Sequence, residues 1–129
     1  MIQNDMTYLL LKKAIDGTQL RQEAIASNLS NLNTKGFKAN KVNFEVELKK
    51  VIEGNKAAGE LDEMKKNISA VEPKVRKDYS GSMNNDGNNV DLDLEMSQLA
   101  ANQILYQSLI QQINQKYRMA SYVIHEGRR

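Results

Sequence analysis

The chain has 129 residues, a length typical of one domain; 40% are hydrophobic, only 5% are aromatic, and there is no tryptophan. Aromatic side chains supply much of the buried area of a compact core, so this composition argues against an enzyme core. The net charge of +2 is too small to indicate nucleic-acid binding. The lack of cysteine excludes disulfides and thiol chemistry. No apolar run of about 18 residues could span a membrane, and the first residues do not resemble a cleavable secretory signal.

Residues 5–33 are predicted to form a first long helix. Its apolar residues alternate in steps of three and four, which is typical of a coiled-coil seam. Gly17 interrupts this helix, either as a tolerated defect or because another helix approaches closely there, and we favour the close approach. The helix is expected to end at Thr34-Lys35-Gly36, where Gly36 can adopt the left-handed conformation.

Residues 40–90 form an irregular middle segment. Residues 40–53 are predicted to contain a short amphipathic helix, and residues 54–67 a mobile loop or marginal helix, because apolar anchors are scarce there. Residues 68–83 are expected to contain short extended segments, with Pro73 at an edge or bend. Turn-forming residues then fill the segments 80–82 and 84–89.

Residues 91–125 are predicted to form a second long helix, about 50 Å in length. Asp91 is the expected N-cap, with acidic side chains in the first turn. This helix must run antiparallel to the first, because the chain leaves the first helix at Gly36 and enters the second at Asp91. The residues predicted to form the seam between the two helices are Leu11, Ile15, Ile25, Leu29, Leu32, Leu92, Met96, Leu99, Ile110, Ile113 and Tyr117.

The predicted fold is therefore mainly α. Long N- and C-terminal helices pack as an antiparallel, coiled-coil-like hairpin, and the middle segment contains a short helix and short β segments. This gives three regions: an N-terminal helix with its turn (residues 1–39), the irregular middle (40–90) and the C-terminal helix (91–129).

Both long helices contain unusual stretches without charge, at residues 97–115 and 24–34. A solvated helix face normally carries Lys and Glu, whereas neutral amides can be buried if each finds a partner. The sequence therefore predicts that these faces contact other protein; the alternative is a Gln-rich surface helix that arose by chance. The residues expected at contacts between subunits are Asn28, Asn31, Asn33, Gly36, Phe37, Gln98, Asn102, Gln103, Tyr106, Gln107, Gln111 and Gln112.

No catalytic, cofactor-binding or metal-binding constellation is expected. The single histidine, His125, lies near the C-terminus with no nucleophile suggested beside it. Asn84, Asp86, Asn88 and Glu95 imitate the spacing of a calcium loop, but Asn replaces the first Asp and the required Gly. A turn that leads into a capped helix explains the same residues.

Two stretches resemble the signatures of the bacterial flagellar rod and hook protein family. Residues 26–38, Ala-Ser-Asn-Leu-Ser-Asn-Leu-Asn-Thr-Lys-Gly-Phe-Lys, are similar to the N-terminal signature, although Lys35 stands where many members have Pro and Phe37 where many have Tyr. Residues 87–96, followed by the Asn-Gln-x-x-Tyr run at 102–106, are similar to the C-terminal signature. The short length and the form Asp-Gly-Asn-Asn-Val-Asp-Leu-Asp point to a basal-body rod member.

This resemblance implies a structural subunit of the proximal rod, which polymerises through its terminal helices into a drive shaft that transmits torque. The implied partners are other copies of the chain, neighbouring rod proteins, the adaptor to the membrane ring and the export gate, and no nucleic acid. The implied location is the rod within the cell envelope, reached by type III export without a cleaved signal. The alternative function is a soluble helical-hairpin adaptor or secretion chaperone, for which charged outer helix faces would be typical.

Overall fold

The computed structural model describes residues 5–127 apart from 57 and 58. In chain order the elements are α1 (Met6–Ser30), β1 (Asn40–Val42), α2 (Phe44–Lys56), α3 (Leu61–Ala70), β2 (Val75–Lys77) and α4 (Leu92–Glu126). The prediction of a mainly helical chain, with two long terminal helices around a middle of short elements, is confirmed.

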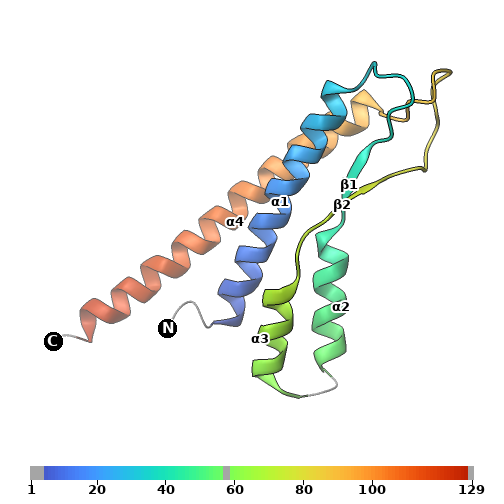
Figure 1. The fold of residues 1–129 in the computed structure, drawn as a ribbon. Helices are drawn as coiled ribbons and strands as arrows, with labels where there is room; N and C mark the ends of the chain where they lie inside the picture. Colours follow the sequence, from blue (N-terminus) through green and yellow to red (C-terminus); the bar gives the residue numbers. More distant parts are fainter. Residues whose placement is uncertain (1–4, 57–58, 128–129) are drawn as a thin grey trace.

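The two long helices lie side by side and run in opposite directions (Figure 1). Near one end of the pair, the hydroxyl of Tyr117 donates to that of Tyr8 at 3.3 Å, and the two rings meet edge to face at 6.0 Å. The start of α4 is fixed by Asp91, whose carboxylate accepts from the backbone N–H of Leu94 at 3.1 Å, so the predicted N-cap is confirmed. At 35 residues, α4 is longer than α1, and the last residues of α4, 121–126, are all exposed.

The middle of the chain covers another side of α1. Helices α2 and α3 form an antiparallel hairpin beside α1, and β1 and β2 pair where this hairpin joins the rest of the chain (Figure 1). The strands are antiparallel, with Asn40 opposite Lys77 and Val42 opposite Val75. The buried cluster that unites α1, β1, α2 and α3 consists of Ala24, Val42, Phe44, Leu48 and Ile68.

Gly17 lies directly against Phe44, the first residue of α2. A Cβ atom built on Gly17 would lie 2.3 Å from two carbon atoms of the Phe44 ring, far inside the contact distance of about 3.5–4.0 Å between carbon atoms. The predicted close approach at Gly17 is therefore confirmed, and the approaching group is an aromatic ring.

The middle segment is more ordered than its composition indicates. The sequence predicts a mobile loop or marginal helix over residues 54–67, and the structure shows helix: residues 54–56 end α2 and residues 61–70 form α3; residues 57 and 58 lie outside the described residues. The reason is Ile68, just beyond the predicted range, which is 0% exposed and anchors α3 in the core. Tertiary packing of this kind stabilises helices that local propensity alone does not.

The seam on α4 is displaced by one residue position from the predicted one. Its buried residues are Glu95, Asn102 and Leu109, whereas the predicted Leu92 and Met96 are 48% and 50% exposed. Two of the three buried residues are polar, so the apolar pattern of the sequence did not mark the most buried positions of the contact, although the predicted Tyr117 meets Tyr8 of α1. Among the other predicted positions, Leu11 and Ile25 are buried, Ile15, Leu29, Leu32, Leu99, Ile110 and Ile113 are half-buried, and Tyr117 is exposed.

Candidate assembly surfaces

Asn88 ties the end of α1 to the segment that enters α4. Its side-chain amide donates to the carbonyls of Asn31, Leu32 and Thr34 at 2.9, 3.1 and 2.8 Å. Its side-chain oxygen accepts from the backbone N–H of Val90 at 2.8 Å, and the residue is 0% exposed. These carbonyls belong to the C-cap residue of α1 and the turn that follows it, so this one side chain holds the exit from α1 and fixes the position where the chain turns into α4.

The turn after α1 is held by two glycines. Gly36 has the expected positive φ, 72°, and its N–H donates to the carbonyl of Asp86 at 2.9 Å. A Cβ atom on Gly87, whose φ is 80°, would lie 3.6 Å from the Gly36 Cα, so the two backbones pass close together. The ring of Phe37 is covered by the ammonium of Lys77 at 4.3 Å, a cation–π contact within the chain.

Two amides that were expected to bond neighbouring subunits are used inside the chain. Asn28 is 1% exposed; it donates to the carbonyl of Asn40 at 2.9 Å and accepts from the N–H of Asn40 at 2.7 Å. Asn102 is 3% exposed and donates to the carbonyl of Thr18 at 2.9 Å and the side-chain oxygen of Gln22 at 3.0 Å. Asn28 therefore fixes β1 on α1, and Asn102 fixes the register of α1 on α4.

Asn31 and Asn33 differ from each other in their surroundings. Asn31 donates to the carbonyl of Ser27 at 2.8 Å and accepts from the hydroxyl of Thr34 at 3.0 Å, so it supports its own helix end. Asn33 is exposed. Of the amides in this region that were expected to contact other subunits, Asn33 is the one whose exposure fits that expectation.

Glu95 is a buried carboxyl group on the inner face of α4. Burial raises its pKa, the nearby charge of Asp91 raises it further, and the amide of Asn28 acts in the opposite direction. One carboxyl oxygen has no hydrogen-bond partner in the described part of the chain. Since the folded state then binds a proton more tightly than the unfolded state, Glu95 contributes stability below the unfolded pKa and loses this contribution as the pH rises through the folded pKa.

We expect Glu95→Gln to raise the free energy of unfolding at neutral pH and to leave it nearly unchanged near pH 4. The amide keeps the shape of the side chain but removes a buried charge. Urea unfolding of both proteins between pH 4 and pH 8 measures the difference, which should grow with pH. Asp93→Asn, an exposed site in the same first turn, is the control. A difference between Glu95→Gln and the original chain that does not change with pH would contradict the prediction.

The exposed side chains of α4 between residues 97 and 115, here called its outer face, carry no charge and are open to solvent. The predicted contact residues Gln98, Gln103, Gln107, Gln111 and Gln112 are all exposed, as is Tyr106. Large apolar side chains lie among and beyond them. Exposed fractions are 66% for Ile104, 57% for Met119, 65% for Tyr122 and 68% for Val123. An apolar and neutral surface of this kind is typical of a protein interface.

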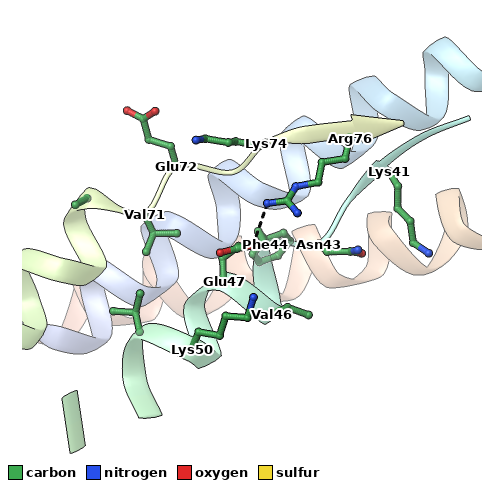
Figure 2. A pocket seen from close by; sticks show the side chains of 12 residues that line it. Lys41, Asn43, Phe44, Val46, Glu47, Lys50, Val71, Glu72, Lys74 and Arg76 are labelled. Atoms are coloured by element: carbon green, nitrogen blue, oxygen red, sulfur yellow. Dashed lines mark hydrogen bonds and ion pairs between the residues drawn. The ribbon is translucent and has the colours of Figure 1, made fainter. Parts of the chain in front are cut away.

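A cleft rich in cations lies at the base of the α2–α3 hairpin, and the sequence did not predict it. Figure 2 shows Lys74 and Arg76 on the side of β2, with Lys50 on α2 and Lys41 on β1 around the same hollow. The cleft holds about 340 Å³. These cations come from separate elements, and only the fold brings them together, so no local pattern in the sequence indicates the cleft.

The structure places no metal-binding group in the described part of the chain, where three or more His, Cys, Asp or Glu side chains nowhere converge. In the loop that imitates a calcium site, the Asp86 carboxylate accepts from the N–H of Asn88 at 3.1 Å, as a turn residue does. None of the helices within the described ranges is both long and apolar enough to cross a membrane.

Comparison with known proteins agrees with these features. A family model described as flagella basal body rod protein matches residues 14–38, most of α1 and its exit, which indicates the class of flagellar rod proteins. The chain is 38% identical over 113 residues to the flagellar basal body rod protein FlgB of Borrelia hermsii, covering 79% of this chain and 83% of that protein. It is 31% identical to FlgB of Bacillus subtilis (strain 168) over 132 residues, covering 92% of each chain. FlgB of Escherichia coli (strain K12) is 28% identical, covering 90% of this chain and 91% of that protein.

The chain belongs to the FlgB family of flagellar basal body rod proteins. This is a family of structural rod subunits of the flagellum, and it is not known for enzymatic activity. Residues 26–38 and 87–96, which carried the resemblance in the sequence, are the segments that Asn88 and the paired glycines join in the fold.

Proposed function

We propose that this chain builds the proximal part of the flagellar rod, and that the uncharged outer face of α4 is the surface through which copies associate. The observation that carries the proposal is the uncharged stretch at residues 97–115, whose glutamines lie exposed while Asn102 and Leu109 face α1. Neutral amides lose less on burial than charges do, so this face can be covered by protein at small cost.

The exposed end of α4 supports the same proposal. Tyr122, Val123 and Ile124 are 65%, 68% and 68% exposed, and within the described ranges α1 does not cover them. Burial of such side chains contributes roughly 1.5–3 kcal/mol each. An open stack of copies would bury them through heterologous contacts, in which different patches of each copy meet. Amide pairs in the contact would fix the register of the stack, which a shaft that transmits torque requires.

Membership in the family also motivates finer proposals about where in the flagellum the chain lies and which proteins it contacts. We propose that the chain lies at the membrane-proximal end of the rod, next to the adaptor to the membrane ring and the export gate. Its setting would be the periplasmic space or cell envelope, reached by type III export without a cleaved signal. Cross-linking in flagellated cells, followed by identification of the linked proteins, tests these contacts.

We expect Gln107→Glu with Gln111→Glu to leave the fold intact and to abolish assembly. Both side chains are exposed in the single chain, so two carboxylates there cost little, but they would be buried without partners in the assembled state. Sedimentation at rising protein concentration, and incorporation into the rod in cells, measure the effect. Lys66→Glu, at an exposed site on α3, changes the net charge by the same two units and should assemble normally. Assembly of the double Glu variant at the original concentration would contradict the proposed surface.

The same experiment addresses the alternative function, a soluble hairpin adaptor or secretion chaperone. An adaptor would sediment as a discrete dimer whose mass does not grow with concentration, whereas a rod subunit should form progressively larger species. The uncharged outer face of α4 favours the rod subunit.

A further inference from the structure

The cationic cleft at the base of the α2–α3 hairpin is a built recess with an excess of positive charge. Lys41, Lys50, Lys74 and Arg76 line it together with two carboxylates, those of Glu47 and Glu72. Its volume of about 340 Å³ lies within the range of protein binding pockets, roughly 300–1,000 Å³.

The charges of the cleft are incompletely neutralised within the chain. Arg76 pairs with Glu47 at 3.4 Å, and Lys41 pairs with Asp78 at 3.8 Å (Figure 2 shows the first pair). Lys50 and Lys74 form no ion pair in the part of the chain that the structure describes. Val46, 51% exposed, contributes an apolar wall. A matching occupant therefore presents carboxylates beside an apolar side chain.

The opposite end of the same hairpin carries that chemistry. Residues 60–63, Glu-Leu-Asp-Glu, begin α3 and are all exposed, with Leu61 at 62%. Lys65 pairs with Asp62 at 3.9 Å, while Glu60 and Glu63 form no ion pair among the described side chains. We call residues 60–63 the acidic tip.

The tip cannot reach the cleft of its own chain. The part of α2 that follows Val46 spans about 15 Å of helix, and Figure 1 shows the start of α3 at the far end of the hairpin from the paired strands. A second copy, shifted along the hairpin axis, would bring its tip to this cleft. The contact is heterologous and leaves a free tip and a free cleft at the two ends, so it repeats without closing.

We propose that the acidic tip of one copy docks in the cationic cleft of the next copy, with Leu61 against Val46 and Glu60 and Glu63 facing Lys50 and Lys74. The contact rests on the proposed function, because it presumes that copies stack, and it gives the charged middle of the chain a role beside the neutral face of α4. Charge complementarity of this kind fixes orientation and excludes wrong partners.

The chain has no cysteine, so disulfide trapping tests the contact directly. We expect Val46→Cys and Leu61→Cys, mixed as separate proteins under mild oxidation, to form a disulfide-linked heterodimer. A chain that carries both cysteines should give a ladder of linked oligomers. A disulfide requires Cα atoms within about 7 Å, so Leu61→Cys mixed with Lys12→Cys, an exposed site on α1, is the control that should not form this product.

Charge reversal separates a specific contact from random collision. Lys74→Glu in the cleft or Glu63→Lys in the tip should each reduce the heterodimer yield several-fold, and the two changes together, one on each partner, should restore it. Three results would overturn the contact. Leu61→Cys alone could form linked dimers, or the chain with both cysteines could give dimers but no ladder. The third is a heterodimer yield that neither charge reversal changes.

A pelleting assay of the original chain identifies which proposal has failed. If the chain assembles with rising concentration but the mixed disulfide does not form, the tip-to-cleft contact is wrong and assembly through α4 stands. If the chain does not assemble, the proposed function fails and the contact fails with it.

Discussion

Gly17→Ala is expected to destabilise the chain by at least about 2 kcal/mol, because overpacking of a core costs about 1–3 kcal/mol and occasionally more. The added Cβ would meet the Phe44 ring at 2.3 Å. Phe44 is 3% exposed and belongs to the buried cluster that unites α1 with the hairpin, so the ring cannot turn aside freely. Alanine is the better helix former by up to about 1 kcal/mol, but the clash acts where α1 and α2 meet and outweighs this gain.

Urea unfolding of Gly17→Ala against Gly54→Ala measures this effect. Gly54 lies on α2, and a Cβ atom added there would meet nothing within 4 Å, so alanine at this position should stabilise the chain slightly. In a Phe44→Leu background the penalty at Gly17 should shrink or reverse, since the smaller side chain leaves room for a methyl group. Equal effects of Gly17→Ala with and without the ring would show that the close approach is not the cause.

The ends of the chain could be predicted from sequence because their patterns are local. Three-and-four periodicity, the N-cap at Asp91 and the positive φ of Gly36 each depend on residues within a turn or two. The face that α4 buries could not be predicted in the same way. Glu95 and Asn102 are inside because their partners lie on α1, and no apolar pattern marks a polar residue as buried.

The packing of the middle segment was underestimated from the sequence for a related reason. Its sequence supplies few apolar anchors, but Ile68 and Phe44 meet across residues far apart in the chain and are both in the buried cluster. The α2–α3 hairpin then covers part of α1, which was expected to depend on other subunits for enclosure. The outer face of α4 is exposed in the single chain and therefore free for the contact with other protein that its lack of charge predicts. The proposed contacts between copies are then restricted to α4, Asn33, Gly36 and the α2–α3 hairpin.

Asn88→Ala is expected to lower the free energy of unfolding by about 2–4 kcal/mol, since a hydrogen bond contributes about 0.5–1.5 kcal/mol net and a buried group left without a partner costs about 1–3 kcal/mol. The substitution removes the donor that three carbonyls of the turn after α1 share, at 2.9, 3.1 and 2.8 Å, and the acceptor for the Val90 N–H. Because Asn88 is 0% exposed, water cannot replace the lost amide without a local opening.

Asn88→Asp makes the mechanism testable separately from the loss of side-chain volume. The carboxylate has nearly the same shape, but it presents an oxygen to three carbonyl oxygens, so we expect a larger loss than for alanine at pH 7. Protonation restores one donor; the folded-state pKa of this Asp is therefore raised, and the loss should diminish as the pH falls from 7 toward about 4 and level off below that. Asn85→Ala, at an exposed position in the same loop, should change stability little. Urea unfolding at pH 7 and pH 3.5, with hydrogen exchange of residues 34–40, distinguishes these outcomes. If Asn88→Asp and Asn85→Ala unfold alike at pH 7, the end of α1 does not depend on this amide.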